Sequence, residues 1–357
     1  MKVVVAMSGG VDSSVAAALL KEGGHEVIGA TMQLRPRDGA GGCGLEAIDV
    51  ARKVARRLDI PHYVLDFRYI FSERVIADFC REYRRGRTPN PCVRCNRYIK
   101  FGALLEKARE MGADFIATGH HARVERSKTG QYLLKKGADS HKDQSYFLYV
   151  LTQEQLKHTL FPIGHLTKAR VRGMAAELGL PVADRPESQE ICFIPDDDYH
   201  GFLKEYLPQA AEPGPILSEE GKNLGRHQGI MFYTIGQRQG LGIAAPQPFY
   251  VTAIQPDKNA IIVGYKEAVY GTELIATDVN WIAGRPEPDF KIKARIRYRH
   301  PEAAATLTPM DDGRVYVKFA APQMAITPGQ AVVFYDGDTV LGGGTIDSRE
   351  GGEIWLQ

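Results

Sequence analysis

Residues 3–14 read Val-Val-Val-Ala-Met-Ser-Gly-Gly-Val-Asp-Ser-Ser, and this stretch decides the fold. Its first half is a short, β-branched apolar run, which is typical of a strand buried in a parallel sheet. The pair Gly9-Gly10 breaks the run, and an alanine-rich helix follows, for which Ser13 or Ser14 is expected to provide the N-cap. The backbone N–H groups of such a loop and the positive end of the helix can hold phosphate. A plain strand-to-helix turn is the alternative, because a glycine pair before a helix is common.

The composition predicts a soluble protein of more than one domain. The chain has 357 residues, of which 44% are hydrophobic and 25% charged, with a net charge of +2. These proportions are ordinary for globular proteins, and the length exceeds one typical domain. No apolar stretch approaches the roughly 20 residues that span a bilayer, and no signal-peptide pattern precedes the first strand. We therefore expect a cytoplasmic protein with no membrane partner.

Strands and helices alternate over the first part of the chain. The expected strands are 3–7, 25–32, 60–67 and 114–118, and the expected helices are 45–58, 71–85, 97–111 and 167–178. This βαβ pattern predicts an α/β fold with a parallel sheet covered by helices. Shorter strands are expected at 131–134 and 145–149, and beyond Pro213 short β runs alternate with turn residues. We predict an α/β domain over 1–212, a small central β domain over 213–274 and a C-terminal β-barrel over 275–357.

The cysteines form a second informative group. Five cysteines, an odd number, do not suggest a disulfide framework. Cys80 lies in an amphipathic helix and is expected in the core, whereas Cys43 lies in a glycine-rich loop. Cys92 and Cys95 form a Cys-x-x-Cys beside arginines that favour the thiolate. Cys192 lies in a polar loop that folding could bring to this pair.

A lone Cys-x-x-Cys is consistent with a redox pair, half a zinc site or part of an iron–sulfur site. Zinc is disfavoured because the chain has no second Cys-x-x-Cys and no histidine pair at ligand spacing. The same region is basic, with six arginines between Arg81 and Arg97. Such a run suits either nucleic-acid binding or a solvated helix face.

The loop over Ser8–Ser14 is not a G-x-x-x-x-G-K-[ST] loop, because no Lys follows the glycines. Its sequence Ser-Gly-Gly-Val-Asp-Ser-Ser instead resembles the loop of the ATP pyrophosphatases. Five blocks in one order resemble the tRNA-specific 2-thiouridylase family: 8–14, 86–96, 118–120, 142–147 and 188–193. Residues 297–299 and 327–332 resemble the C-terminal barrel of that family. The resemblance implies a transferase that uses ATP to adenylate the C2 oxygen of uridine 34 in the tRNA anticodon. Sulfur from a cysteine persulfide then replaces that oxygen.

The resemblance also assigns residues and partners. Cys192 would carry the persulfide, and Cys95 would attack it, leaving a Cys95–Cys192 disulfide. The residues implied to contact ATP are Ala6, Met7, Ser8, Gly9, Gly10, Val11, Asp12, Ser13, Met32 and Gly119, with Asp12 helping to place Mg²⁺ and pyrophosphate. Those implied to contact tRNA are Asn90, Pro91, Cys92, His120, Lys142, Asp143, Gln144, Arg297, Tyr298 and Gln330. The implied partners are the tRNA anticodon stem-loop and a sulfur-donor protein, such as a cysteine desulfurase or a sulfur relay protein.

One position departs from the family pattern. Many members carry Asp three residues before the attacking cysteine, where this chain has Cys92, so a carboxylate proposed as general acid/base is replaced by a thiol. A second mechanism therefore stays open, in which Cys92, Cys95 and Cys192 hold a [4Fe–4S] cluster whose fourth iron binds sulfide. Two rival functions remain: an ATP pyrophosphatase that transfers nitrogen, which has no use for three thiols, and a non-catalytic RNA-binding module.

Overall fold

The computed structural model describes residues 1–34, 45–185, 191–194 and 198–349. Cys43 and residues 188–190 of the fifth family block lie outside this part. The chain divides into two compact units. The first comprises Met1–Ile76, Pro91–Asp198 and Asp338–Leu341, and the second Ala77–Asn90, Tyr199–Gly337 and Gly342–Gln357.

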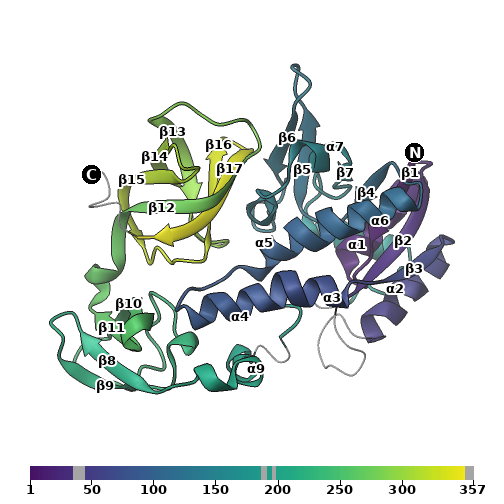
Figure 1. Ribbon diagram of the computed structural model, residues 1–357. Coiled ribbons are helices and arrows are strands. Elements are labelled where there is room, and N and C mark those ends of the chain that lie inside the picture. The colour runs from purple at the N-terminus through teal and green to yellow at the C-terminus, as the bar shows by residue number, and fades with distance from the viewer. Residues whose placement is uncertain (35–44, 186–190, 195–197, 350–357) are drawn as a thin grey trace. The chain divides into compact units, whose positions relative to one another are not determined.

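A parallel sheet forms the centre of the first unit (Figure 1). Its strands are β1 Lys2–Ala6, β2 Glu26–Gln33, β3 His62–Asp66, β4 Phe115–Ala117 and β7 Thr159–Leu160, in the order β3-β2-β1-β4-β7. The central strand β1 pairs with β2 up to Ala6↔Ala30 and with β4 up to Val5↔Ala117. Because β1 is covered on both faces, its whole run Val3–Val5 is fully buried. The predicted α/β parallel sheet is confirmed.

Helices pack against this sheet through apolar side chains. The helical segments of the unit are α1 Val11–Glu22, α2 Leu45–Leu58, α3 Arg68–Phe71, η1 Ser72–Ile76, α5 Pro91–Cys95, η2 Asn96–Ala103, α6 Leu104–Glu110, η3 Ser145–Leu148, α7 Gln153–Lys157 and α8 Lys168–Glu177. Among them η1 and η2 are π-helical. Side chains of α1, α2 and α8 share one core with Val3 and Val5. None of the described helices is long and apolar enough to cross a membrane.

Two local predictions in this unit are wrong. Residues 145–149 were expected as a strand, but Ser145–Leu148 is a 3₁₀-helix. Nearly all of its aromatic and aliphatic side chains are buried. The run therefore lacks the alternation of apolar and polar residues by which a strand is distinguished from a helix. Neither Ser13 nor Ser14 caps α1: the N-cap is Gly10, and both hydroxyls lie in the first turn and donate to the Gly10 carbonyl (3.2 and 2.8 Å).

A hairpin completes the first unit. Strands β5 Ala122–Arg126 and β6 Tyr132–Lys136 pair antiparallel, and β6 also pairs with Thr339 and Val340, which belong to this unit. The Arg123 guanidinium donates to the Asp338 carboxylate (2.7 Å). The two-stranded ribbon is thereby extended by a segment from the end of the chain.

The second unit is mostly β structure, as the sequence predicts. A four-stranded sheet has the order β10-β11-β8-β9, built from β8 Gly214–Ser218, β9 Asn223–His227, β10 Tyr250–Gln255 and β11 Ala260–Gly264. A six-stranded barrel follows, built from β12 Tyr270–Trp281, β13 Phe290–Arg295, β14 Ala303–Pro309, β15 Val315–Met324, β16 Ala331–Asp336 and β17 Thr339–Ser348. Its order is β12-β15-β14-β13-β16-β17, and pairing of β12 with β17 closes it. The predicted C-terminal β-barrel is confirmed.

Short helices accompany these sheets. They are α4 Ala77–Arg84, α9 Tyr199–Tyr206, η5 Pro208–Ala210, η6 Ile230–Phe232, η7 Pro256–Lys258 and η8 Lys266–Val269. Aromatic contacts join α4 to α9: Phe79 lies edge-on to Phe202, and Tyr83 stacks on Tyr199. Cys80 is buried in α4, as expected, and burial raises the pKa of its thiol to about 11.

Candidate active site

The carboxyl ends of β1, β2 and β4 lie at one edge of the parallel sheet, where α/β folds bind ligands. Residues 7–10 connect the end of β1 to the start of α1 at this edge. The Met7 N–H donates to the Ala30 carbonyl (2.8 Å), which ties the loop to β2. Met32 is half-buried on β2. The residues predicted to contact nucleotide thus lie on neighbouring strands and on the helix between them.

Two glycines allow this loop to adopt its shape. Gly9 has φ +73°, and a Cβ there would lie 2.6 Å from the Ala47 carbonyl oxygen. Gly119, just after β4, approaches α1 so closely that a Cβ would lie 2.6 Å from backbone atoms of Asp12 and Ser13. The Ser8 N–H donates to the Ser13 hydroxyl (3.2 Å), which folds the loop over the helix end. The first N–H groups of an α-helix have no partner inside the helix, so this end is suited to an anion.

Gly119→Ala is expected to damage the loop directly. The added methyl group meets rigid backbone rather than a flexible side chain. We expect a loss of about 1–3 kcal/mol in unfolding free energy, the usual cost of overpacking, and a raised KM for ATP. Chemical denaturation and ATP-dependent kinetics measure the two effects. Gly173→Ala on α8 is the control, since its nearest atoms lie 3.9 Å away or more and belong to surface side chains.

Asp12 lies in the first turn of α1 and contacts a buried lysine. The Lys168 ammonium donates to both carboxylate oxygens of Asp12 at 2.7 Å. Lys168 begins helix α8, which is N-capped by Thr167, and is only 8% exposed. Burial opposes ionisation of Asp12, but His121 and Lys168 outweigh it and hold the pKa of the carboxyl below its usual value. Lys168 is not among the residues predicted from the sequence, where its position behind a Thr cap, at the positive end of a helix, is the signal that indicates it.

His121 is the third polar group beside this loop. Its Nε2 lies 3.5 Å from the nearer Asp12 oxygen. The side chain is almost completely buried, and within the described part of the chain neither ring nitrogen has a hydrogen-bond partner. A buried polar group without a partner costs free energy, so such groups commonly mark places where a ligand supplies the partner.

The three thiols of interest also belong to the first unit. Pro91–Cys95 form the short helix α5, in which Cys95 is buried, whereas Cys92 and Cys192 are exposed by surface area. Protein atoms nevertheless surround the Cys92 sulfur, and burial raises the pKa of Cys92 to about 11 and that of Cys95 to about 12. The charge of Cys192 raises both pKa values further, and the charge of Lys100 lowers both. The three cysteines thus interact electrostatically.

His120 contacts Lys100, the residue whose charge lowers the pKa values of Cys92 and Cys95. It is 8% exposed, and the rings of Phe101 and Phe161 pack against it at 5.9 Å. Its Nδ1 lies 2.7 Å from the Thr118 hydroxyl and its Nε2 3.3 Å from the Lys100 ammonium. Burial, with the charge of Lys100 as a smaller cause, holds the pKa of His120 well below 6.5. His120 is therefore a neutral, largely enclosed imidazole.

The other predicted tRNA residues of the first unit brace the site. Asp143 is buried, and its carboxylate accepts from the backbone N–H groups of Gly137 and Ser145 at 3.1 Å. The Gln144 side-chain oxygen accepts from the His121 N–H at 3.0 Å. Lys142 is half-exposed and Pro91 is buried. Gln144 thus holds the backbone at His121, and Asp143 holds the backbone at Gly137 and Ser145.

The predicted tRNA residues of the second unit also make backbone contacts. The Gln330 amide donates to the carbonyls of Thr88 and Pro89 (3.0 and 3.1 Å), and Arg297 donates to the Met324 carbonyl (2.8 Å). Asn90 and Tyr298 are half-buried. Gln330 therefore fixes the segment that precedes Asn90.

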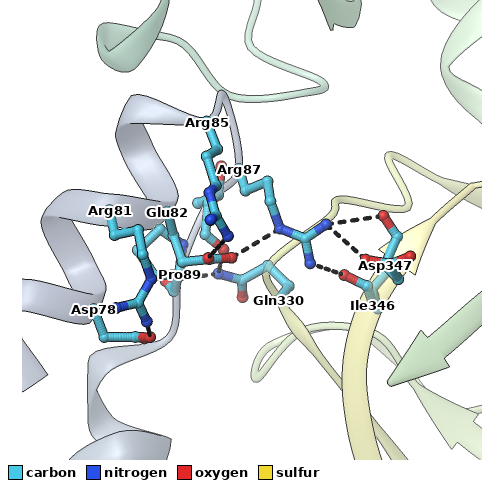
Figure 2. Close-up of polar contacts among 10 residues, drawn as sticks. Asp78, Arg81, Glu82, Arg85, Arg87, Pro89, Gln330, Ile346 and Asp347 are labelled. Atoms are coloured by element: carbon cyan, nitrogen blue, oxygen red, sulfur yellow. Dashed lines mark hydrogen bonds and ion pairs between the residues drawn. The ribbon is translucent and has the colours of Figure 1, made fainter. Parts of the chain in front are cut away.

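Part of the basic run is neutralised inside the second unit. Figure 2 shows Arg81 paired with Asp78, and Arg85 and Arg87 both paired with Glu82. Arg87 also donates to Asp347 and to the Ile346 carbonyl at 2.9 and 3.0 Å. Of these three arginines only Arg81 lies on helix α4, which ends at Arg84, so the contacts show ion pairing within the unit and do not decide between nucleic-acid binding and a solvated helix face.

Each section of the chain matches a family model. Residues 1–196 match a tRNA methyl transferase HUP domain, residues 200–265 a tRNA methyl transferase PRC-barrel domain and residues 271–346 an aminomethyltransferase beta-barrel domain. Proteins named tRNA-specific 2-thiouridylase MnmA are similar over the full length. That of Heliobacterium modesticaldum is 56% identical and aligns with 96% of this chain and 92% of its own; that of Moorella thermoacetica is 56% identical, with 97% and 99%. This chain belongs to the tRNA-specific 2-thiouridylase family.

Membership of this family confirms the resemblance that the five sequence blocks indicate. The first family model is named for methyl transfer, but the relatives that match from end to end are named for thiolation. Among solved structures, the U34-tRNA thiolase NcsA from Methanococcus maripaludis with its [4Fe-4S] cluster is 21% identical. It covers 52% of this chain and 60% of its own, with a TM-score of 0.35, which is too low to support any argument about this site.

Proposed function

We propose that this family member catalyses ATP-dependent 2-thiolation of uridine 34 in the tRNA anticodon. The observation that carries the proposal is the presence, in one unit, of a glycine loop suited to phosphate and three electrostatically coupled thiols. A phosphate loop alone suits many adenylating enzymes, whereas coupled thiols suit sulfur transfer. The full-length similarity to proteins named tRNA-specific 2-thiouridylase supports tRNA as the substrate. We also propose a cytoplasmic location.

In the first step the uridine O2 attacks the α-phosphorus of ATP, and pyrophosphate leaves. Residues 8–13 would hold the phosphates through their backbone N–H groups, and Lys168 would balance their charge beside Asp12. The two ring nitrogens of His121 would find partners in the bound nucleotide. Asp12, whose side chain is 30% exposed, would help to hold Mg²⁺, which neutralises phosphate charge when bound.

In the second step sulfur replaces the adenylated oxygen. The Cys95 thiolate attacks the Cys192 sulfur of the persulfide, an S–S bond forms between the two cysteines, and the outer sulfur leaves as hydrosulfide. Hydrosulfide attacks C2, AMP leaves with the former uridine oxygen, and the protons of the thiol and persulfide pass to solvent. The Cys95–Cys192 disulfide then needs two electrons from an external dithiol. A cysteine desulfurase or sulfur relay protein would restore the persulfide.

The residues that would contact tRNA remain those of the family resemblance. Cys92 and its neighbours Asn90 and Pro91 would surround the target base. Lys142, which is half-exposed, would contact phosphate, and Tyr298 would stack on a base. The contacts described for Asp143, Gln144, Arg297 and Gln330 support an additional role for these four in holding the backbone.

The cluster alternative needs three thiols arranged as ligands of one group. In residues 1–34, 45–185, 191–194 and 198–349, no three His, Cys, Asp or Glu side chains are placed to hold a metal ion. The described thiols therefore do not fit a cluster as they stand.

Anaerobic purification followed by thiolation in one tube tests the proposal. We expect an iron-free, colourless enzyme that converts uridine 34 to 2-thiouridine with a persulfide donor, forming one AMP and one pyrophosphate per thiolated tRNA. Iron content, the absorption spectrum and nucleoside mass analysis provide the readouts. Activity only in iron-containing fractions would support the cluster instead. Pyrophosphate release with a small carboxylate and no tRNA would indicate a different ligase, and no tRNA-stimulated release would indicate a binding module.

A further inference from the structure

Lys100 follows Cys95 by five residues, across the start of a π-helical segment. The segment from Asn96 to Ala103 is π-helical, and at its end the Leu104 N–H bonds to Ile99, five residues earlier. The turn of a π-helix is wider than that of an α-helix, so a residue five positions on comes closer to the same face than it does in an α-helix. The wider π-helical turn therefore brings Lys100 closer to the face that carries Cys95 than an α-helical turn would.

The head group of Lys100 is held by His120. An ammonium can only donate a hydrogen bond, so the His120 Nε2 at 3.3 Å must accept. The proton of the neutral ring then resides on Nδ1, which donates to the Thr118 hydroxyl at 2.7 Å. Because the ring is buried between Phe101 and Phe161, it keeps this orientation. His120 thus holds the Lys100 ammonium in place. Because His120 is neutral, this hydrogen bond does not cancel the positive charge of Lys100.

The charges acting on the Cys95 thiol come from few groups. Lys100 favours its thiolate, whereas burial and the charges of Cys192 and Cys92 oppose it. His120 contributes no charge because it is neutral. Among the described residues, Lys100 is thus a cation that counters the unfavourable environment of this sulfur.

We propose that Lys100, held by His120, is a positioning residue that stabilises the negative charge on the Cys95 sulfur during attack on the persulfide. The role of Lys100 in sulfur transfer rests on the proposed function. Its effect on the ionisation of the Cys95 thiol does not, because that effect is a property of the protein without substrates. The thiol proton passes to solvent, and the S–S bond of the Cys192 persulfide breaks as the Cys95–Cys192 bond forms.

Alkylation of Cys95 by iodoacetamide tests the inference without ATP or tRNA. In this reaction the thiolate forms an S–C bond and iodide leaves, so the pH profile of the rate reports the thiol pKa. Lys100→Gln keeps a donor for His120 but removes the charge, and Lys100→Arg keeps the charge. We expect Lys100→Gln to move the profile to higher pH and to slow alkylation at pH 8 by about tenfold, which corresponds to one pKa unit. Lys100→Arg should stay within about threefold of the wild type.

The control is Lys107→Gln, because Lys107 pairs with Glu110 on the exposed surface of α6. Peptide mass analysis assigns the alkylated cysteine, and circular dichroism confirms folding. If Lys100→Gln fails to fold, His120→Phe, which releases the ammonium, should shift the profile in the same direction. An unshifted profile in whichever folded variant is measured, or an equal shift in Lys100→Arg and Lys100→Gln, overturns the inference. Thiolation of tRNA is assayed separately from alkylation. Failure of the proposed function can therefore be distinguished from failure of the inference about Lys100.

Discussion

Cys192→Ser is expected to lower tRNA thiolation by at least about a thousandfold while tRNA-stimulated pyrophosphate release continues. Serine cannot carry a persulfide, so the variant loses the covalent step, whose removal typically costs this much or more. Adenylation depends on the loop at residues 8–13 and not on a thiol. Nucleoside mass analysis and a pyrophosphate assay on the same samples separate the two steps. Cys95→Ser should show the same division, with the persulfide still detectable on Cys192.

Cys80→Ala is the matched control for these variants. Cys80 is a buried thiol of α4 with no place in the proposed chemistry. Its removal should reduce stability by roughly 1 kcal/mol through the small cavity and leave thiolation per folded molecule unchanged. Thiolation by Cys192→Ser above about a tenth of the wild-type rate would show that sulfur is not carried on Cys192.

The sequence was most informative where one short motif needs one conformation. The β-branched run at Val3–Val5 is buried on both faces of a sheet, as its composition predicts. Glycine is needed at position 9 because φ is positive there and the Ala47 carbonyl is close. Together they predicted strand, loop and helix correctly. The run at 145–149 failed because its apolar residues are buried all round, which removes the periodicity that distinguishes a strand from a helix.

The residues that complete the candidate site were harder to predict. Lys168 is 156 positions from Asp12, and no local pattern shows that α8 begins beside α1. His121 is not predicted as a site residue. Two adjacent histidines after a strand do not show which ring will be buried without hydrogen-bond partners. Lys100 requires a π-helical turn, which changes which residues share a side without changing the apolar pattern. Each depends on tertiary or backbone geometry that a one-dimensional pattern does not encode.

Lys168→Met is expected to reduce tRNA-stimulated pyrophosphate release by about a hundredfold to a thousandfold. The substitution keeps much of the length of the side chain but removes the cation that contacts both Asp12 oxygens at the phosphate loop. Loss of one preorganised electrostatic group at a reacting phosphate typically costs this much. It also removes both Lys168 hydrogen bonds to the Asp12 carboxylate, so the pKa of Asp12 should rise toward its usual value. Steady-state kinetics at saturating ATP measure the loss.

Arg170→Met on the same helix is the control. Arg170 pairs with Glu177 at the surface, and such an exposed ion pair contributes about 1 kcal/mol or less to stability. Lys168→Arg should recover part of the activity, since it restores the charge with a larger head group in a nearly buried position. The Asp12 carboxyl has a lowered pKa, so it stabilises the fold above its unfolded pKa and loses that contribution as pH falls through the folded pKa. Lys168→Met should therefore weaken the acid dependence of unfolding that Asp12 causes, whereas Arg170→Met should not. Unchanged pyrophosphate release in a folded Lys168→Met enzyme would mean that the Asp12–Lys168 pair only joins α1 to α8.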